Sequence, residues 1–215
     1  MKKIDDEEPD LILIQETYEY QNRITGIDKK YRIFTAGTGK HRAAIIIINS
    51  NIDATLITKL SDEDTALEEI IHEKWKFFTA SMYFDLEDEI ENNFNKMDEL
   101  MRFVKCGRIL IAVDSNSRSK TWNDSKKKNA LGTKMEEYLV SKHTHIVNEE
   151  SERPNFFNSR GSSNIDLTIA NNNLVAEVTD LEISNEDSLS DHNYIQYKIS
   201  KGGDCNQNNS NTARV

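Results

Sequence analysis

The sequence predicts a layered α/β domain, with α+β as the alternative, in which two sheets pack together and helices lie outside. Short apolar runs typical of strands outnumber helical stretches, and the helical stretches lie between them. The length of 215 residues suffices for one domain with a sizeable core, and only 2 prolines and 8 glycines argue against a linker-rich chain. We expect one domain over residues 9–200, preceded by a residual N-terminus (1–8) and followed by a disordered polar tail (201–215).

The strands are predicted from short apolar or alternating runs. Residues 11–14 and 43–48 are continuous apolar runs, which suits strands buried on both faces. Residues 31–35 and 165–169 alternate between apolar and polar side chains, as half-buried strands do. Further strands are expected at residues 54–58, 75–83, 108–113, 178–183 and 194–199.

Two segments have helical periodicity. In residues 85–105, apolar side chains recur every three or four positions, at Ile90, Phe94, Met97, Leu100, Met101 and Val104. Residues 131–142 place Met135, Tyr138 and Leu139 on one side of a second helix. Both helices lie between predicted strands, so we expect them to cover a sheet.

The net charge of -10 argues at first against a nucleic-acid partner. The charge is unevenly distributed, however, because residues 101–145 carry 10 basic and 4 acidic side chains, a net of +6. This basic island follows the strand at 108–113 and includes Arg118 and Lys120. Such a patch can hold phosphates with modest, salt-sensitive affinity, and the alternative is a solvated lysine loop.

Several classes of protein are disfavoured by the sequence. The longest apolar stretch, residues 43–48, is too short to cross a bilayer, and the N-terminus lacks the apolar region of a secretory signal. Cys106 and Cys205 lie far apart, and we interpret both as reduced thiols in an intracellular protein. The chain has no P-loop and no Gly-x-Ser-x-Gly turn, and His143 and His145 have no nearby cysteine pair to complete a zinc site.

A carboxylate and an amide follow the strand at 108–113. If the extended conformation continues, Asp114 and Asn116 leave the same face of the sheet. Together they can orient a water molecule against a phosphorus centre. The alternative is a simple Asp-Ser-Asn turn after a strand.

A second pair of residues strengthens the interpretation. Asp166 lies on a strand between apolar neighbours, where a carboxylate is costly unless it is paired, and His192 is the natural partner. An Asp-His pair favours the charged imidazole, which can stabilise an anionic pentacovalent phosphorus. Glu16 ends an apolar run and can bind a hard cation such as Mg²⁺, and the phenol of Tyr83 can donate to a phosphate oxygen. An ordinary strand-ending glutamate and a half-buried tyrosine are the alternatives.

An ordered set of motifs over residues 9–199 resembles the endonuclease/exonuclease/phosphatase superfamily. Within it, the set is most similar to the apurinic-type endonuclease domain of non-LTR retrotransposons. The motifs are Gln15-Glu16, Ser81-Met-Tyr83, Val113-Asp-Ser-Asn116, Ser163-Asn-Ile-Asp-Leu-Thr168 and Ser190-Asp-His192.

The resemblance implies a four-layered, deoxyribonuclease I-like sandwich of two mixed β-sheets flanked by helices. It also implies nicking of DNA with Mg²⁺, for which Mn²⁺ can substitute, leaving a 3′-hydroxyl that primes reverse transcription. The implied partners are DNA and the reverse transcriptase domain of a longer parent polyprotein, with no membrane, in a monomer that acts in the nucleus. The implied metal residues are Glu16 and Asp191, the catalytic residues are Tyr83, Asp114, Asn116, Asp166 and His192, and the substrate-binding residues are Arg118, Lys120, Ser163 and Thr168.

One departure from the family pattern concerns the N-terminus. Family members begin with a strand that carries an asparagine, whereas only eight residues precede Pro9 here. We therefore expect that strand to be missing, and the chain alone to be weakly active or inactive unless the piece is supplied elsewhere. There are two alternative functions. The chain is either another phosphodiesterase or phosphatase of the superfamily, or a catalytically silent remnant that acts as a binding module. Target specificity is expected in the loops at residues 26–38, 120–129 and 155–163.

Overall fold

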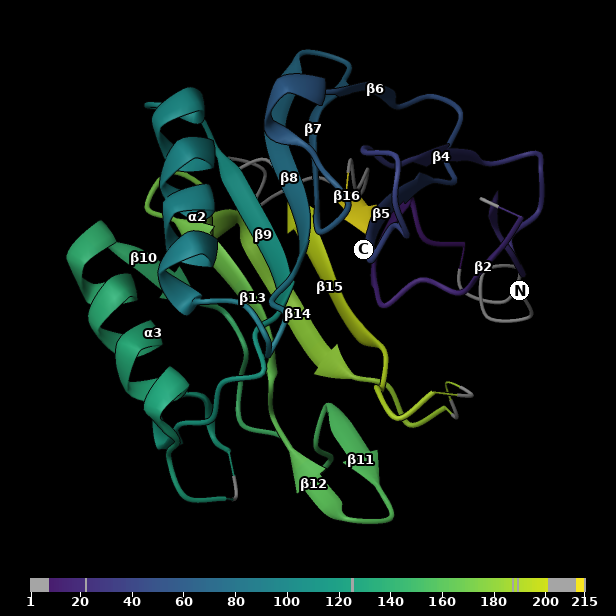
Figure 1. The fold of residues 1–215 in the computed structure, drawn as a ribbon. Coiled ribbons are helices and arrows are strands. Elements are labelled where there is room, and N and C mark those ends of the chain that lie inside the picture. The colour runs from purple at the N-terminus through teal and green to yellow at the C-terminus, as the bar shows by residue number, and fades with distance from the viewer. Residues whose placement is uncertain are drawn as a thin grey trace.

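The centre of the molecule is a six-stranded mixed sheet in the order β10-β13-β9-β8-β7-β6 (Figure 1). Strands β8 and β9 run parallel, and their neighbours are antiparallel. The strands are β6 (Asp53–Leu56), β7 (Thr65–His72), β8 (Trp75–Tyr83), β9 (Ile109–Asp114), β10 (Thr144–Ile146) and β13 (Asp166–Asn171). The computed structural model describes residues 8–21, 23–124, 126–186, 188 and 190–200, and the backbone of Thr212–Arg214.

Two three-stranded antiparallel sheets lie against one face of the large sheet. One has the order β1-β5-β4 and the other β14-β15-β16. Side chains of both, among them Leu11, Ile45 and Ile199, share a buried core with Phe77 and Leu110 of the large sheet, which confirms the predicted two-sheet sandwich. The strands are β1 (Leu11–Gln15), β4 (Arg32–Phe34), β5 (Ala43–Ile47), β14 (Val178–Ile183), β15 (Ile195–Ser200) and β16 (Thr212–Arg214).

Helices α2 (Ile90–Val104) and α3 (Ala130–Lys142) cover the opposite face of the large sheet (Figure 1). Because side chains alternate along a strand, Phe78 and Met82 of β8 face these helices and pack with Met97 and Leu100. The first helix begins at Ile90 rather than at residue 85, since Asp85 caps a turn by accepting from the Glu87 N–H at 2.9 Å. Within the described ranges no α-helix covers the outer faces of the smaller sheets, so the implied fourth layer is not seen there.

Other elements were absent from the sequence prediction. β7 is one of these, because the glutamate pair Glu68-Glu69 interrupts its apolar pattern. The other unpredicted elements are β10 and β16, β2 (Glu19–Tyr20), β3 (Arg23–Ile24), β11 (Phe156–Asn158) and β12 (Gly161–Ser163), with 3-10 turns at Thr58–Leu60, Lys120–Trp122 and Val175–Glu177.

The polar tail is described only in part. Residues 201–211 and Val215 lie outside the described residues, whereas Thr212–Arg214 form β16 and pair with β15. Within the described part of the chain, no helix combines the length and the apolar character needed to cross a membrane.

Candidate active site

Two carboxylates stand at neighbouring strand ends of the large sheet. Asp114 ends β9, Asp166 begins β13, and the two residues are directly paired in the antiparallel register. Their chain neighbours Val113 and Leu167 face the helices, so alternation turns both carboxylates toward the smaller sheets. Both residues are nearly buried, with 2% and 9% of their surface exposed.

The opposite layer contributes the other half of the site. Glu16 directly follows β1, and His192 precedes β15. His192 Nδ1 lies 2.9 Å from one Asp166 carboxylate oxygen and 3.1 Å from the other. The other ring nitrogen, Nε2, lies 3.8 Å from a Glu16 oxygen and 3.9 Å from an Asp114 oxygen. The contact predicted between Asp166 and His192 is therefore present, and the imidazole joins all three carboxylates.

Burial and mutual repulsion shape the charges of the site. Burial, followed by the nearby charge of Asp166, raises the pKa of Asp114 to about 8. Burial also raises the pKa of Asp166. For His192, burial lowers the pKa, but the hydrogen bond to Asp166 and the surrounding carboxylates outweigh it and raise the pKa to about 9. At neutral pH the imidazole is therefore protonated and acts as a donor.

The donor set fits a divalent cation. Glu16, Asp114 and His192 each offer a ligand atom, and these atoms lie within 4.8 Å of one another. Carboxylate oxygens are the ligands that hard cations prefer, and a cation here would oppose the burial and the repulsion that together raise the pKa of Asp114. Since His192 is protonated, the two carboxylates are the better ligands of the three.

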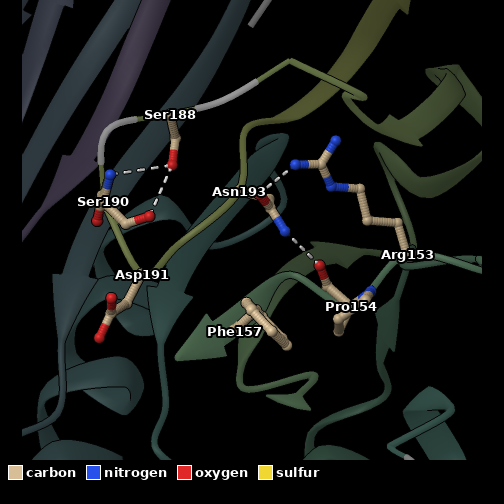
Figure 2. Close-up of a pocket in the computed structure, with 7 residues that line it drawn as sticks. All are labelled: Arg153, Pro154, Phe157, Ser188, Ser190, Asp191 and Asn193. Atoms are coloured by element: carbon tan, nitrogen blue, oxygen red, sulfur yellow. Dashed lines mark hydrogen bonds between the residues drawn. The ribbon is translucent and has the colours of Figure 1, made fainter. Parts of the chain in front are cut away.

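Asp191 was also implied as a metal residue, and it is not one of these three. Its exposed side chain lies on the rim of a neighbouring hollow of about 650 Å³, shown in Figure 2, which Arg153 and Phe157 also line. The structure thus brings Glu16 into the cluster and leaves Asp191 on the rim beside it.

Tyr83 joins the site through Glu16. Burial, the charge of Glu16 and a hydrogen bond to Glu16 raise the pKa of the phenol above its usual range, so the phenol keeps its proton. The Arg42 guanidinium packs over the ring of Tyr83 as a cation–π contact, with the guanidinium carbon 4.9 Å from the ring centroid. The same guanidinium forms a forked contact with Asp64, at 2.5 and 2.6 Å, and pairs with Asp85. Nothing in the sequence around Arg42 signalled this role.

Asn116 reaches the site by a different route from the predicted one. The expectation that Asp114 and Asn116 share a face of an extended strand is wrong, because β9 ends at Asp114 and Asn116 has a left-handed φ of 50°. Instead, the Asn116 N–H donates to an Asp114 oxygen at 3.3 Å, and its side-chain amide donates to the Phe84 carbonyl at 3.0 Å. Glu16 also has a left-handed backbone, with φ 53°. The left-handed residues at the two strand ends thus place the Glu16 carboxylate in the cluster and turn the Asn116 amide to the Phe84 carbonyl, so that Asn116 touches Asp114 through its backbone.

The predicted substrate-binding residues lie away from the cluster or deeper in the fold. Thr168 is 2% exposed and lies two positions along β13 from Asp166, between the layers. Ser163 is 4% exposed and pairs with Phe156 across β11 and β12. Neither hydroxyl is placed at the surface.

The basic island is partly neutralised by the protein itself. Lys120 is exposed and donates to the Asp124 carbonyl at 2.9 Å. Lys134 pairs with Glu91 at 2.5 Å and Lys142 with Asp98 at 2.7 Å, and neither acid belongs to residues 101–145. The Arg118 contact with Asn129, at 2.9 Å, is made by the backbone N–H and leaves the guanidinium charge unchanged. The positive charge counted in the sequence is thus larger than the charge left for a ligand.

A polar contact joins the two layers beneath Glu16. The Gln15 side-chain amide donates to the Ser81 hydroxyl at 2.8 Å, and that hydroxyl donates to the Ile14 carbonyl at 2.7 Å. Both residues belong to motifs noted in the sequence, but their contact could not be inferred from one strand at a time. It fixes β1 against β8 and so fixes the position of Glu16.

Comparisons with known proteins agree with this geometry. The sequence model of the endonuclease–reverse transcriptase family matches residues 77–196. The chain is 26% identical over 196 residues to a retrovirus-related Pol polyprotein from the type-1 retrotransposable element R1 of Bradysia coprophila. It is 23% identical over 190 residues to a putative 115 kDa protein of the element R1DM from Drosophila melanogaster. These alignments cover 85% of this chain but only 19% and 18% of the relatives, so the chain spans about a fifth of their length.

Solved structures share the fold. The endonuclease domain of TRAS1, a telomere-specific non-LTR retrotransposon, superposes with a TM-score of 0.82 at 23% identity, covering 92% of this chain and 88% of that domain. The apurinic endonuclease LMAP from Leishmania major superposes with a TM-score of 0.69 at 12% identity, covering 89% and 78%. The deoxyribonuclease I-like fold of packed mixed sheets that the motifs imply is therefore confirmed, with helices on one outer face within the described residues.

Proposed function

The chain belongs to the endonuclease–reverse transcriptase family, and on this premise we propose that it is the DNA-nicking endonuclease domain of a non-LTR retrotransposon. The observation that carries the proposal is the convergence of Glu16, Asp114 and His192, with Asp166 behind the imidazole. In the proposed reaction, water attacks one phosphodiester and leaves a 3′-hydroxyl.

The proposed partners follow from the same premise. The relatives are several times longer than this chain, and one of them is a Pol polyprotein. We propose that a reverse transcriptase domain of a longer parent polyprotein extends the 3′-hydroxyl, and that the reaction takes place on nuclear DNA.

Glu16 and Asp114 are the residues that would hold a divalent cation, which we propose to be Mg²⁺ with Mn²⁺ as a substitute. Such an ion supplies a Lewis acid that withdraws charge from a phosphate oxygen. The apposed carboxylates support this assignment, because burial and the charges of Asp166 and Glu16 raise the pKa of Asp114 to about 8 even with His192 beside it, and a cation would oppose that rise.

The protein's own groups have separate roles in the proposal. Asp166 binds His192 Nδ1, which leaves Nε2–H turned toward the cluster, where it can donate to an oxygen of the phosphate. Asp114 accepts a proton from the attacking water or orients it, and Asn116 lies beside that carboxylate. The protonated phenol of Tyr83 is a second donor for the phosphate.

The test is nicking of supercoiled plasmid by excess protein in Mg²⁺, compared with EDTA. We expect His192→Ala to slow nicking by about 100-fold or more, in line with the loss of one donor to a developing anion. Asp180→Asn is the matched control, because its carboxylate pairs with Lys198 at the surface of β14. A His192→Ala variant that nicks as fast as the wild-type protein would reject the proposal, whereas weak nicking by the wild-type chain agrees with the expectation from its sequence. Extension of the nick by a DNA polymerase would test for the 3′-hydroxyl.

A further inference from the structure

Asn155 is a buried amide side chain beside the first residues of β13. Only 1% of its surface is exposed. Its Oδ1 accepts from the backbone N–H of Ile165 at 2.9 Å and of Asp166 at 3.2 Å, and its Nδ2 donates to the Asp166 carbonyl at 2.8 Å. One side chain thus bonds both backbone polar groups of Asp166, as a neighbouring strand would.

The Asn155 amide bonds the edge of β13 at a point where the neighbouring strand β10 no longer pairs with it. β10 pairs with β13 only at Thr144–Ile146, and the last backbone bond on that edge joins the Val147 N–H to the Thr168 carbonyl at 2.9 Å. Nearer the site, the edge of β13 is bonded by two side chains: the Asn148 amide shares the Asp166 carbonyl at 3.1 Å, and only Asn155 also accepts from the Asp166 N–H. Buried backbone groups without such partners are costly, so Asn155 holds the Asp166 end of the strand in place.

The backbone of the same residue holds the segment that carries His192. The Asn155 carbonyl accepts from the Asn193 N–H at 2.7 Å, and the Phe157 N–H donates to the Asp191 carbonyl at 2.7 Å. Phe156 forms a β-bridge with His192, and the edge of one ring faces the other with centroids 4.9 Å apart.

Side chains reinforce this pairing, as Figure 2 shows. Asn193 donates to the Pro154 carbonyl at 2.7 Å and accepts from the Arg153 guanidinium at 3.0 Å. Residues 153–157 therefore run alongside residues 191–193 as a short ladder.

We propose that Asn155 is a positioning residue that sets the distance between Asp166 and His192. The Asn155 side chain bonds Asp166, and the Asn155 backbone bonds the segment that carries His192. Asn155 therefore links Asp166 to His192 independently of the 2.9 Å hydrogen bond between them. Asn155 is not among the residues of the cluster, and it acts through His192. The effect on cleavage rests on the proposed function, whereas the effect on the imidazole does not.

A matched control lies at the other end of the same strand. Asn171 ends β13, and its side-chain amide also bonds two backbone groups, donating to the Gly107 carbonyl at 2.8 Å and accepting from the Ile109 N–H at 3.3 Å. It shares the residue type and the kind of contact with Asn155 and lies on the strand that Asn155 bonds, but its own contacts are to Gly107, just before β9, and to Ile109, the first residue of β9. If Asn155 contributed only to stability, its replacement and the replacement of Asn171 would have the same effect on kcat and on the Nδ1 signal of His192.

The experiment compares Asn155→Ala, Asn155→Ser and Asn171→Ala in the full 215-residue chain. The readouts are kcat and KM for plasmid nicking, thermal melting, and the NMR signal of the proton on His192 Nδ1. We expect Asn155→Ala to lower kcat by about 10- to 100-fold with KM within about twofold, as a displacement of about 1 Å would. The Nδ1 proton should exchange faster with water, and Asn155→Ser, which keeps a shorter donor and acceptor, should recover part of both losses. Asn171→Ala should lower the melting temperature but keep kcat and the Nδ1 signal.

A folded Asn155→Ala protein with the same Nδ1 signal and the same kcat as Asn171→Ala would overturn the proposal. If Asn155→Ala does not fold, Asn155→Ser decides the question by the same two readouts. If the wild-type chain does not nick, the Nδ1 signal of the variants still decides whether Asn155 positions His192.

Discussion

Asp114 and Asp166 lie directly opposite each other at the end of the antiparallel pair β9–β13, with their side chains on the same face and nearly buried. Like charges at directly opposed positions destabilise a sheet, and burial adds the cost of desolvation. The raised pKa values of both carboxyls follow from this arrangement. The chain therefore maintains a repulsion that either a proton or a cation can relieve.

Asp114→Asn is expected to stabilise the metal-free protein while abolishing nicking. The amide keeps the shape of the side chain and removes one of two apposed buried charges, which should raise the free energy of unfolding by about 1–3 kcal/mol. Thermal melting in EDTA at about pH 8, near the pKa of Asp114, measures the effect. The exposed Asp180→Asn variant should change little, and a lower melting temperature for Asp114→Asn would contradict the prediction.

Mg²⁺ or Mn²⁺ is expected to raise the melting temperature of the wild-type protein. A ligand at about 100 times its Kd stabilises the folded state by about 2.7 kcal/mol. Glu16→Gln should remove most of this gain, because Glu16 offers one of the clustered ligand atoms. Asp191→Asn should keep it, because Asp191 lies on the rim of the neighbouring pocket. If Asp191→Asn abolished the rise in melting temperature and Glu16→Gln did not, the cation would be bound by Asp191 and not by Glu16.

Glu68 is expected to make stability depend on pH. Its carboxyl on β7 is fully buried, and within the described residues neither oxygen has a hydrogen-bond partner. Burial raises its pKa from 4.5 to about 8, although the charge of Arg32 opposes the shift. The folded state therefore binds this proton more tightly than the unfolded state does. Stability should fall as the pH rises from about 4.5 to about 8 and level off above that.

Urea unfolding of Glu68→Gln at several pH values tests this dependence. The variant should lose the part of the slope that lies between the two pKa values. Glu69→Gln is the neighbouring control, because its carboxylate pairs with Lys76 at 2.5 Å on a partly exposed face. Equal slopes for the wild-type protein and Glu68→Gln would show that this carboxyl does not keep its proton on folding.

Arg42→Lys is expected to lower nicking by about tenfold although the charge is kept. Lysine cannot reproduce the forked contact with Asp64, and its compact ammonium supports the ring of Tyr83 less well. Arg108→Lys is the matched control, since Arg108 pairs with Glu177 near the opposite end of β9. Plasmid nicking and melting of the two variants should separate a loss at the site from a loss of stability. Equal nicking by both would remove Arg42 from the site.

Much of the fold could be predicted because its signals are local. The apolar runs that became β1, β5 and β9, and the helical spacing that became α2, are properties of neighbouring residues. β7 could not be recognised in the same way, since Glu68 is a charged residue type on a fully buried position. Only its pairing with β8 along the whole strand makes that segment extended.

The candidate site was predictable in its residue types but not in its geometry. The sequence pointed to Glu16, Asp114, Asp166 and His192 through their places at strand ends and through a family resemblance. It could not show that Asn116 enters through a left-handed turn, since that depends on where β9 stops pairing. Asn155 was overlooked because its importance lies in contacts with two segments that are distant in the sequence from each other.

The sequence by itself determined the kinds of side chain available and the strands and helices that carry them, because periodicity and residue chemistry are set within a few neighbouring residues. The tertiary structure alone decided which strand ends meet, since the register of Asp114 with Asp166 joins segments about fifty residues apart. It also decided which carboxyls are buried and how close they lie, and therefore their pKa values. Burial and distance are properties of the assembled layers, and no single segment of the chain contains them.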